Sequence, residues 1–331
     1  MELIRVENLR IYFPLKKSIL GGVRGWVRAV DGVDLVIGSR TAVSIVGESG
    51  SGKTTLGKAV AGLVRPTSGR VLWRGRDVYS LPKEEYALFR RRVQYMPQDP
   101  YSAFNPSKTV FDHLCIPLMR WGKASNRLEC VDAVAKILES VKVTPPEEYM
   151  FRYPHQLSGG ERQRILFARI MMVEPELVVT DEPVSAIDVA LRVDQMNLML
   201  DFLERLGVSY LFISHELASA RYMAERGGGF IAVMYLGRIV EQGPPRQLVE
   251  NPLHPYTEAL VDATPELDLE RARSKRLRLR SVDVPKPYEE IKGCRFSNRC
   301  PDAMPRCFEE EPPLIEVSSG RLVRCWKFVK R

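Results

Sequence analysis

The sequence predicts an α/β fold with a largely parallel sheet, a helical insertion and a small C-terminal module. Short apolar runs alternate with segments of helical spacing along most of the chain, and this order favours a parallel sheet covered by helices. Residues from about 100 to 170 have mostly helical patterns, which predicts the insertion. The end of the chain, from Cys294 onward, holds four of the six cysteines and is set apart by them as a module.

Size and charge limit the class of protein. A chain of 331 residues is long enough for two domains, or for one large domain with an extension. It has no apolar run near the roughly twenty residues that span a bilayer, and "MELIRVENLR" carries charges where a signal peptide is apolar. We therefore expect a cytoplasmic protein with reduced thiols. The net charge of +8 fits a nucleic-acid or lipid partner and a merely Arg-rich composition equally well.

The N-terminal part of the pattern runs from two strands to a buried strand and a helix. "LIRVENLRIYF" and "VRAVDGVDLVI" alternate as strands do, with "LKKSILGGVRGW" as the loop between them. "TAVSIV" (41–46) is a short apolar run that predicts a buried strand. After a Gly-rich turn, "TTLGKAVAGLV" has helical spacing, and "LFRRRVQYMPQDP" predicts a strand that ends at Pro97.

Strands and helices alternate again after the insertion. The helices of the insertion itself are predicted in "RLECVDAVAKILESVKV" and "GGERQRILFARIMMV". Strands are then predicted in "ELVVTDEP", "SYLFISHE" and "FIAVMYLGRIV", with a helix in "VDQMNLMLDFLERLG". Residues 271–280 hold six basic residues and predict a connector to the cysteine module, while "RLRLRSVDV" alternates well enough to be a strand.

A phosphate-binding loop is predicted in "GESGSGKT" (47–54), which fits the pattern G-x-x-x-x-G-K-[ST] between a strand and a helix. Glycines at 47, 50 and 52 let the backbone turn tightly, so that several N–H groups point at one phosphate chain. The helix start adds its positive dipole end. Lys53 can reach the β- and γ-phosphates, and the Thr54 hydroxyl can ligate Mg²⁺. The sequence therefore predicts a nucleoside triphosphate site.

Two carboxylates end the apolar strand in "LVVTDEP" (177–183). Ligands bind at the carboxyl edge of an open α/β sheet, and successive side chains of a strand point in opposite directions. We therefore expect different tasks for the two acids. Asp181 would hold Mg²⁺ through the water shell of the metal, and Glu182 would act as general base on the attacking water.

"QLSGGERQR" (156–164) places a Ser and two Gly at the start of a helix, which makes a second anion site. One nucleotide does not need two such loops from one subunit. We infer that the second loop serves the nucleotide of another subunit, so the active unit is a dimer.

This arrangement resembles the ATP-binding subunits of ABC transporters, and the resemblance runs from about residue 1 to 250. "LSGGERQ" is similar to their signature motif, "SAID" (185–188) to their D-loop, and His215 in "FISHE" to their switch histidine. The resemblance implies a RecA-like P-loop NTPase core with an ABC-type β subdomain and a helical subdomain. It also implies that Gln98 contacts Mg²⁺ and the membrane subunits, and that Phe13 or its neighbour Tyr12 stacks on adenine.

The expected site residues follow from these motifs and the resemblance together. The catalytic residues are Lys53, Gln98, Glu182 and His215. The Mg²⁺ ligands are Thr54, Gln98 and Asp181. The nucleotide-binding residues are Tyr12, Phe13, Gly47, Ser49, Gly50, Ser51, Gly52, Lys53, Thr54, Thr55, Gln98, Ser158, Gly159, Gly160, Gln163 and Asp188.

The C-terminal part, residues 251–331, resembles the extension of oligopeptide and dipeptide importer ATPases and of relatives that carry nickel or oligosaccharides. "NPLHPYTEAL" (251–260) and "GCRFSNRCPDAMPRC" carry this resemblance. It implies a second homologous ATPase as partner, two transmembrane permeases and an extracellular solute-binding protein. It also implies a peripheral position on the cytoplasmic face of the cell membrane.

The spacing of the tail cysteines is C-x₅-C-x₆-C-x₁₇-C, formed by Cys294, Cys300, Cys307 and Cys325. Structural zinc sites usually contain C-x₂₋₄-C pairs, which are missing here, and a reducing compartment argues against disulfides. The family resemblance implies a [4Fe–4S] cluster, because some members bind one through four such cysteines. Zn²⁺ is the first alternative, and unligated or disulfide-bonded cysteines are the second. Cys115 and Cys130 are expected to be plain core or surface residues.

Two other functions stay open at this point. A soluble ABC ATPase that acts on nucleic acid is weakly favoured by the net charge. It is disfavoured because the chain has neither a long coiled-coil insertion nor a second cassette, so no nucleic-acid partner is expected. An accessory ATPase of a carbon–phosphorus lyase complex is the other alternative. The cargo of an importer cannot be read from this chain.

Overall fold

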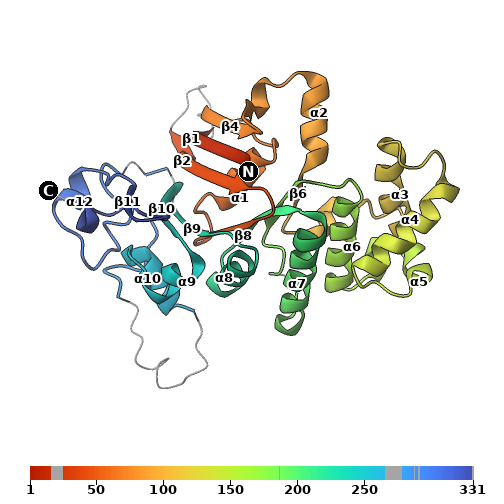
Figure 1. The fold of residues 1–331 in the computed structure, drawn as a ribbon. Helices are drawn as coiled ribbons and strands as arrows, with labels where there is room; N and C mark the ends of the chain where they lie inside the picture. Colours follow the sequence, from red (N-terminus) through yellow and green to blue (C-terminus); the bar gives the residue numbers. More distant parts are fainter. Residues whose placement is uncertain (16–24, 186, 265–277, 287, 290, 330–331) are drawn as a thin grey trace.

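The computed structural model describes residues 1–15, 25–185, 187–264, 278–286, 288–289 and 291–329 (Figure 1). Most of the predicted basic connector therefore lies outside the described residues. Residues 278–284, for which alternation predicted a strand, contain none. None of the described helices is both long enough and apolar enough to cross a membrane.

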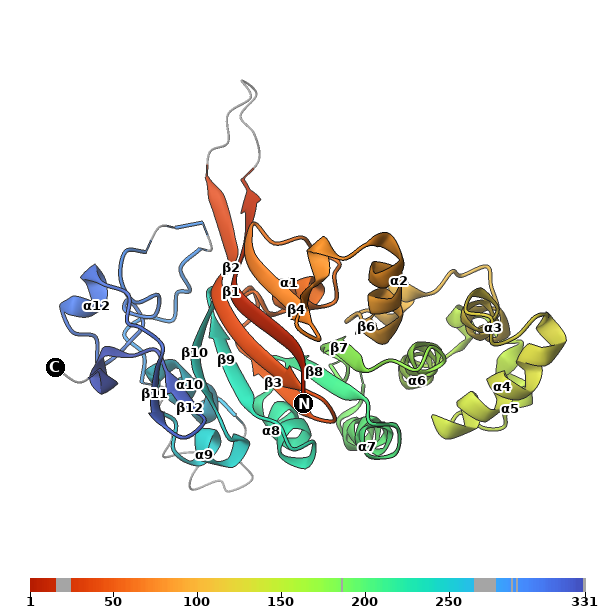
Figure 2. The ribbon, with the colours of Figure 1, turned by 45° about the horizontal axis from the view of Figure 1, so that its top comes forward.

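The N-terminal strands form an antiparallel sheet of order β2-β1-β4-β5. Its strands are β1 (Glu2–Pro14), β2 (Trp26–Gly38), β4 (Ser68–Trp73) and β5 (Arg76–Asp77). Ile4 and Val6 of β1 are buried in alternation, and after a register shift between Val6 and Leu9 the alternation continues with Leu9 and Ile11, so one face packs on the core. This sheet lies across the phosphate loop and helix α1 (Lys53–Val60) in both views (Figures 1 and 2).

The main sheet has the order β11-β12-β10-β9-β3-β8-β7-β6. Five strands run parallel, and their bounds are β3 (Ala42–Val46), β6 (Val93–Met96), β7 (Leu177–Asp181), β8 (Ser209–Ser214) and β9 (Ile231–Tyr235). Every residue of β3, β7, β8 and β9 is buried, as expected for a sheet covered on both faces. β10 (Arg238–Gly243) adds to β9 in the antiparallel direction.

The helices cover this sheet and form an arm at one end of it. The helices of the core are α1, α2 (Lys83–Arg92), α7 (Val189–Leu206) and α8 (Leu217–Arg226). The arm consists of α3 (Val110–Arg120), α4 (Arg127–Ser140), α5 (Pro146–Met150) and α6 (Gly159–Met171), with short 3₁₀ turns at Pro100–Ala103 and Pro154–Gln156; a further 3₁₀ turn, Val78–Ser80, lies between β5 and α2. The expected helical subdomain at about 100–170 corresponds to this arm.

The C-terminal extension lies at the end opposite the arm (Figures 1 and 2). It follows α9 (Pro245–Glu250) and begins with α10 (Pro255–Asp262); its later elements are α12 (Arg306–Glu309), β11 (Ile315–Ser318), β12 (Arg321–Val323) and a 3₁₀ turn at Trp326–Phe328. β12 pairs with β10 through Glu241↔Val323 and Gln242↔Leu322. The extension thus continues the main sheet.

A buried ion pair fixes this junction. Arg321 donates to the Glu241 carboxylate over 2.6 Å, and both side chains are almost completely buried. Glu241 also accepts hydrogen bonds from the backbone N–H groups of Leu253 and His254. A buried carboxylate is costly unless its oxygens are paired, and here they are. The pair therefore fixes the "HPYT" turn against the edge of the core sheet.

Cys115 and Cys130 correct one expectation. They are not separate residues, because the structure joins them in a disulfide with a Cα–Cα distance of 5.4 Å. The apolar faces of α3 and α4 pack against each other, and both cysteines are buried at that contact. The sequence separation of 15 residues gives no sign of this pairing without the packing of the two helices.

Candidate functional site

The phosphate loop passes through a space that only glycine can occupy at two positions. A Cβ on Gly47 would lie 2.1 Å from the Met234 carbonyl oxygen, and one on Gly52 would lie 2.0 Å from that of Ala29. Both glycines also have positive φ, at 156° and 104°. The loop is therefore held between β2 and the end of β9, and its course is fixed by backbone contacts on both sides.

Lys53 is buried inside this loop. Its Nζ donates to the carbonyl oxygens of Gly47 and Glu48 over 2.7 and 3.0 Å. Burial lowers the pKa of Lys53, and the carboxylates of Glu182, Asp181 and Glu48 oppose that shift. A cation at this depth, surrounded by carbonyls and carboxylates, attracts a polyphosphate with little competition from water.

Thr54 and Asp181 meet as a pair suited to Mg²⁺. The Thr54 hydroxyl donates to Asp181 Oδ1 over 3.1 Å, and the Tyr95 hydroxyl donates to Oδ2 over 2.8 Å. Asp181 is buried at the end of β7, at the carboxyl edge of the sheet. Hydroxyl and carboxylate oxygens are ligands that Mg²⁺ prefers, so the donor set fits the expected ion.

Glu182 and His215 form the second polar contact of this edge. His215 Nδ1 lies 2.7 Å from Glu182 Oε2, and the carboxylate accepts this hydrogen bond. Glu182 has a left-handed φ of 51°, which is uncommon for a side-chain-bearing residue and is typical of functional positions. The turn directs its carboxylate into the nucleotide cavity, where a base with an oriented partner can accept a proton from water.

These residues line one cavity of about 430 Å³. Its lining consists of Phe13, Val27, Ala29, Ser49, Gly50, Gly52, Lys53, Thr54, Thr55, Gln98, Glu182 and His215. The structure distinguishes between Phe13 and Tyr12, the two candidates for stacking on adenine. Phe13 lines the cavity with 43% of its surface exposed, whereas the Tyr12 hydroxyl donates to Asp31 on β2. Neighbours on a strand face opposite sides, so Phe13 is the one placed to stack on a base.

The second loop opens onto a different cavity, of about 310 Å³. Ser158, Gly159, Gly160 and Asp188 lie together in its lining. Ser158 caps α6 in a reciprocal box with Glu161, and the first turn of the helix is exposed. The first and second loops of one chain therefore line separate cavities, as the expectation of a shared dimer site requires.

Besides Tyr12, three predicted binding residues lie outside both linings. Gln163 is buried on α6, and its side-chain amide donates to the Pro183 carbonyl over 2.8 Å. It thus ties the second loop to the turn after Glu182. Ser51 is buried beneath the phosphate loop, and its Oγ has no hydrogen-bond partner among the described residues. Gly47 acts through its carbonyl, which accepts from Lys53.

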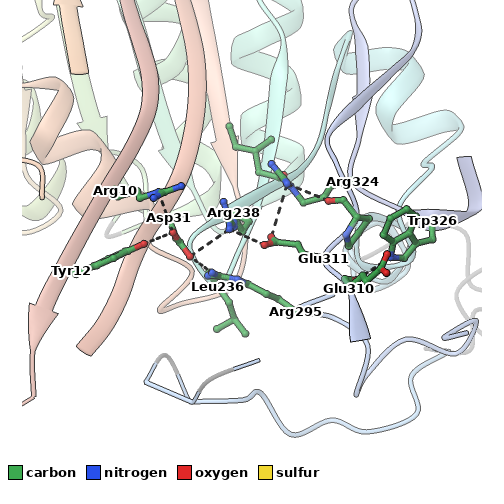
Figure 3. Close-up of polar contacts among 12 residues, drawn as sticks. Arg10, Tyr12, Asp31, Leu236, Arg238, Arg295, Glu310, Glu311, Arg324 and Trp326 are labelled. Atoms are coloured by element: carbon green, nitrogen blue, oxygen red, sulfur yellow. Dashed lines mark hydrogen bonds and ion pairs between the residues drawn. The ribbon is translucent and has the colours of Figure 1, made fainter. Parts of the chain in front are cut away.

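The C-terminal extension contributes residues that the sequence did not indicate. Tyr256 of the "HPYT" motif and Arg299 both contact Glu48, which lies inside the phosphate loop. Figure 3 shows a second connection, in which Arg295 reaches Asp31 and the Leu236 carbonyl. Arg238 then links Asp31 to Glu311. No local motif signals these contacts, because the partners are far apart in the sequence.

The four tail cysteines line one small cavity together with His254. All four are free thiols in the structure. Burial raises the pKa of Cys294 to about 12 and that of Cys300 to about 11. Four thiols are the donor set of iron–sulfur and zinc sites. The cavity volume of about 10 Å³ is, however, only that of one water. The described residues contain no group of three or more His, Cys, Asp or Glu side chains arranged to hold a metal ion.

Comparisons with known proteins agree with this geometry. Residues 30–185 match the family described as ABC transporter, and residues 240–307 match the oligopeptide/dipeptide transporter, C-terminal region. The dipeptide transport ATP-binding protein DppF of Haemophilus influenzae is 38% identical over 98% of this chain and 96% of its own length. The oligopeptide transport ATP-binding protein OppF of Salmonella typhimurium is 36% identical with the same coverage.

Solved structures show the same core. A dimeric bacterial ABC transporter cassette is 25% identical with a TM-score of 0.62, covering 72% of this chain and 96% of that one. An ABC transporter cassette in its ADP conformation is 26% identical with a TM-score of 0.60, covering 76% of this chain and 96% of that one. The matches confirm the expected cassette core.

Replacing Lys53 with Ala should abolish tight ATP binding, because it removes the buried cation that faces the phosphates. Titration of the full-length protein with MgATP measures this directly. Lys58→Ala on the same helix is the matched control and should bind as the unchanged protein does. Retained affinity in Lys53→Ala would show that the loop does not hold the phosphates.

Replacing Glu182 with Gln should keep ATP binding and lower turnover by about 10²–10⁴-fold, since the amide cannot accept the proton of water. Phosphate release and ATP affinity are measured side by side, and a dimer trapped with ATP is expected in gel filtration. Glu204→Gln, on the exposed end of α7, serves as control. Unchanged hydrolysis in Glu182→Gln would exclude this carboxylate as the base.

Proposed function

The chain belongs to the ATP-hydrolysing subunits of ABC transporters, and from this we propose that it drives the import of peptides. The observation that carries the proposal is the contact of an oligopeptide-type extension with the phosphate loop of the ATP site. Tyr256 and Arg299 of that extension bond directly to the phosphate loop. The curated relatives are named as dipeptide and oligopeptide transport proteins, which favours the importer over a nucleic-acid or lyase-complex ATPase.

Hydrolysis would take place between two such subunits. Lys53 binds the β- and γ-phosphates, while Thr54 and Asp181 hold Mg²⁺ with Gln98 at the rim of the cavity. The second loop of the partner, with Ser158 and Gly160, closes over the γ-phosphate. Glu182 then takes a proton from the attacking water, and His215 orients the carboxylate through its hydrogen bond. Because ATP makes contacts with both subunits that ADP does not, it favours the closed dimer.

The partners proposed are a second, homologous ATPase, two transmembrane permeases and an extracellular solute-binding protein. The subunit would attach to the cytoplasmic face of the membrane through the permeases. Support comes from the position of Gln98, which lines the nucleotide cavity and is exposed at the start of the helical arm. A permease docked on the surface around Gln98 would move when the ATPase dimer closes.

We also propose that Cys294, Cys300, Cys307 and Cys325 bind a metal group. Their approach around one cavity supports this, and the resemblance of the tail to that of family members with a cluster implies [4Fe–4S], with zinc as the alternative. The small volume of the cavity is an argument for a single ion rather than a cluster. When bound, either group would act as a structural clip, and an iron–sulfur cluster would add sensitivity to redox state.

Transport is tested by reconstituting the subunit with its permeases and binding protein in vesicles. Peptide is expected to stimulate ATP hydrolysis and to accumulate inside, and Glu182→Gln should abolish both. Nickel complexes and oligosaccharides are compared as cargo under the same conditions. Uptake of one of these without peptide uptake would replace the proposed cargo, and failure of the subunit to bind any permease would contradict the importer role.

Metal content is measured after purification without oxygen, as iron, acid-labile sulfide and zinc with the visible spectrum. Four irons and four sulfides per chain, lost in Cys300→Ser, are expected for the cluster. The control is Cys115→Ser/Cys130→Ser, which removes both cysteines of the disulfide in the helical arm and should leave the metal unchanged. One zinc without sulfide would assign the alternative, and no metal would contradict both.

A further inference from the structure

Glu48 lies inside the phosphate loop, and its carboxylate and its backbone N–H are held from the C-terminal extension. Arg299 Nη1 and Nη2 donate to its two carboxylate oxygens over 2.8 and 2.9 Å. The Glu48 backbone N–H donates to the Tyr256 hydroxyl over 2.8 Å. A two-bond arginine–carboxylate contact fixes both distance and orientation. The extension thus determines where one side chain and one amide of the phosphate loop point.

The groups that hold Glu48 are themselves rigid. The Arg299 side chain is only 6% exposed, and its guanidinium lies over the rings of Tyr235 and Phe296. Tyr235, Tyr256 and Phe296 pack against one another with ring centroids 4.6 to 5.4 Å apart. An arginine fixed by aromatic packing loses little further freedom when it pairs, so the contact with Glu48 is prepared in advance.

Glu48 also acts on Lys53. Lys53 Nζ donates to the Glu48 backbone carbonyl over 3.0 Å, so the residue that carries this carboxylate is in direct contact with the ammonium group. A Glu48 carboxylate turned toward Lys53 would compete with the phosphates of a nucleotide for the Lys53 ammonium group, and it would repel the phosphates. Pairing with Arg299 neutralises Glu48 and turns its carboxylate toward the extension. The loop keeps its acidic residue without presenting the charge to the nucleotide.

We propose that Arg299 is a positioning residue of the ATP site, which keeps Lys53 available for phosphate by holding Glu48 away from it. Arg299 is not among the residues that line the nucleotide cavity, so it would act on that site through Glu48. The inference rests on ATP binding at this loop and is independent of cargo, permease and metal.

The test compares four variants of the full-length protein by MgATP titration. Arg299→Met keeps the length of the apolar stem and removes the charge, and it should weaken binding about tenfold or more. Arg299→Lys keeps the charge without the two-bond geometry, and it should weaken binding by a smaller factor. Glu48→Gln alone gives the reference affinity of a loop without the carboxylate. The double variant Arg299→Met/Glu48→Gln should bind within about threefold of that reference, because the competing charge is absent in both.

Recovery in the double variant separates positioning from a merely structural role. A loss of packing would lower the thermal midpoint of both Arg299→Met variants and leave both weak in binding. Arg306→Met is the matched control, since Arg306 pairs with Glu310 on the surface of the same extension. If Arg299→Met does not fold, Arg299→Lys with and without Glu48→Gln carries the same comparison. Unchanged affinity in the Arg299 variants, or no recovery in the double variant, overturns the proposal. Loss of binding in Lys53→Ala tests the loop itself and is independent of these outcomes.

Discussion

Close backbone contact on both sides of the phosphate loop is the constraint on which the rest of the site depends. The carbonyls of Ala29 on β2 and Met234 on β9 approach so near to Gly52 and Gly47 that a single methyl group would not fit. The antiparallel sheet and the main sheet therefore cannot shift relative to each other without moving the loop. This contact sets the position of Lys53, and through Thr54 it sets the position of Asp181. The packing of the two sheets therefore determines the geometry of the catalytic residues.

The sequence predicted the parts of the site that depend on local pattern. Strand ends and a glycine-rich turn were enough to place Lys53, Thr54, Asp181 and Glu182, because parallel strands bring their carboxyl ends to one edge. The choice between Tyr12 and Phe13 needed the register of β1. The disulfide of Cys115 and Cys130 needed the packing of α3 on α4. Long-range polar contacts were missed for the same reason, since Glu48 and Arg299 are 251 positions apart.

The phosphate loop and the second loop belong to different parts of the structure. The first belongs to the sheets, and the second caps α6 in the helical arm, with Gln163 linking that helix to the turn after Glu182. A rotation of the arm would change the distance between the second loop and any partner while leaving Lys53 in place. Binding and closure can thus be separated, which is what an energy-coupling subunit needs.

The junction between the extension and the phosphate loop has a consequence for selective inhibition. The ABC transporter family match covers residues 30–185, whereas Arg299 lies within the match to the oligopeptide/dipeptide transporter C-terminal region at residues 240–307. A compound that wedges between Tyr256, Arg299 and Glu48 would act on ATP binding from behind the nucleotide cavity. Tyr256 and Arg299 belong to the extension, so cassettes without such an extension would lack the contact that the compound disrupts.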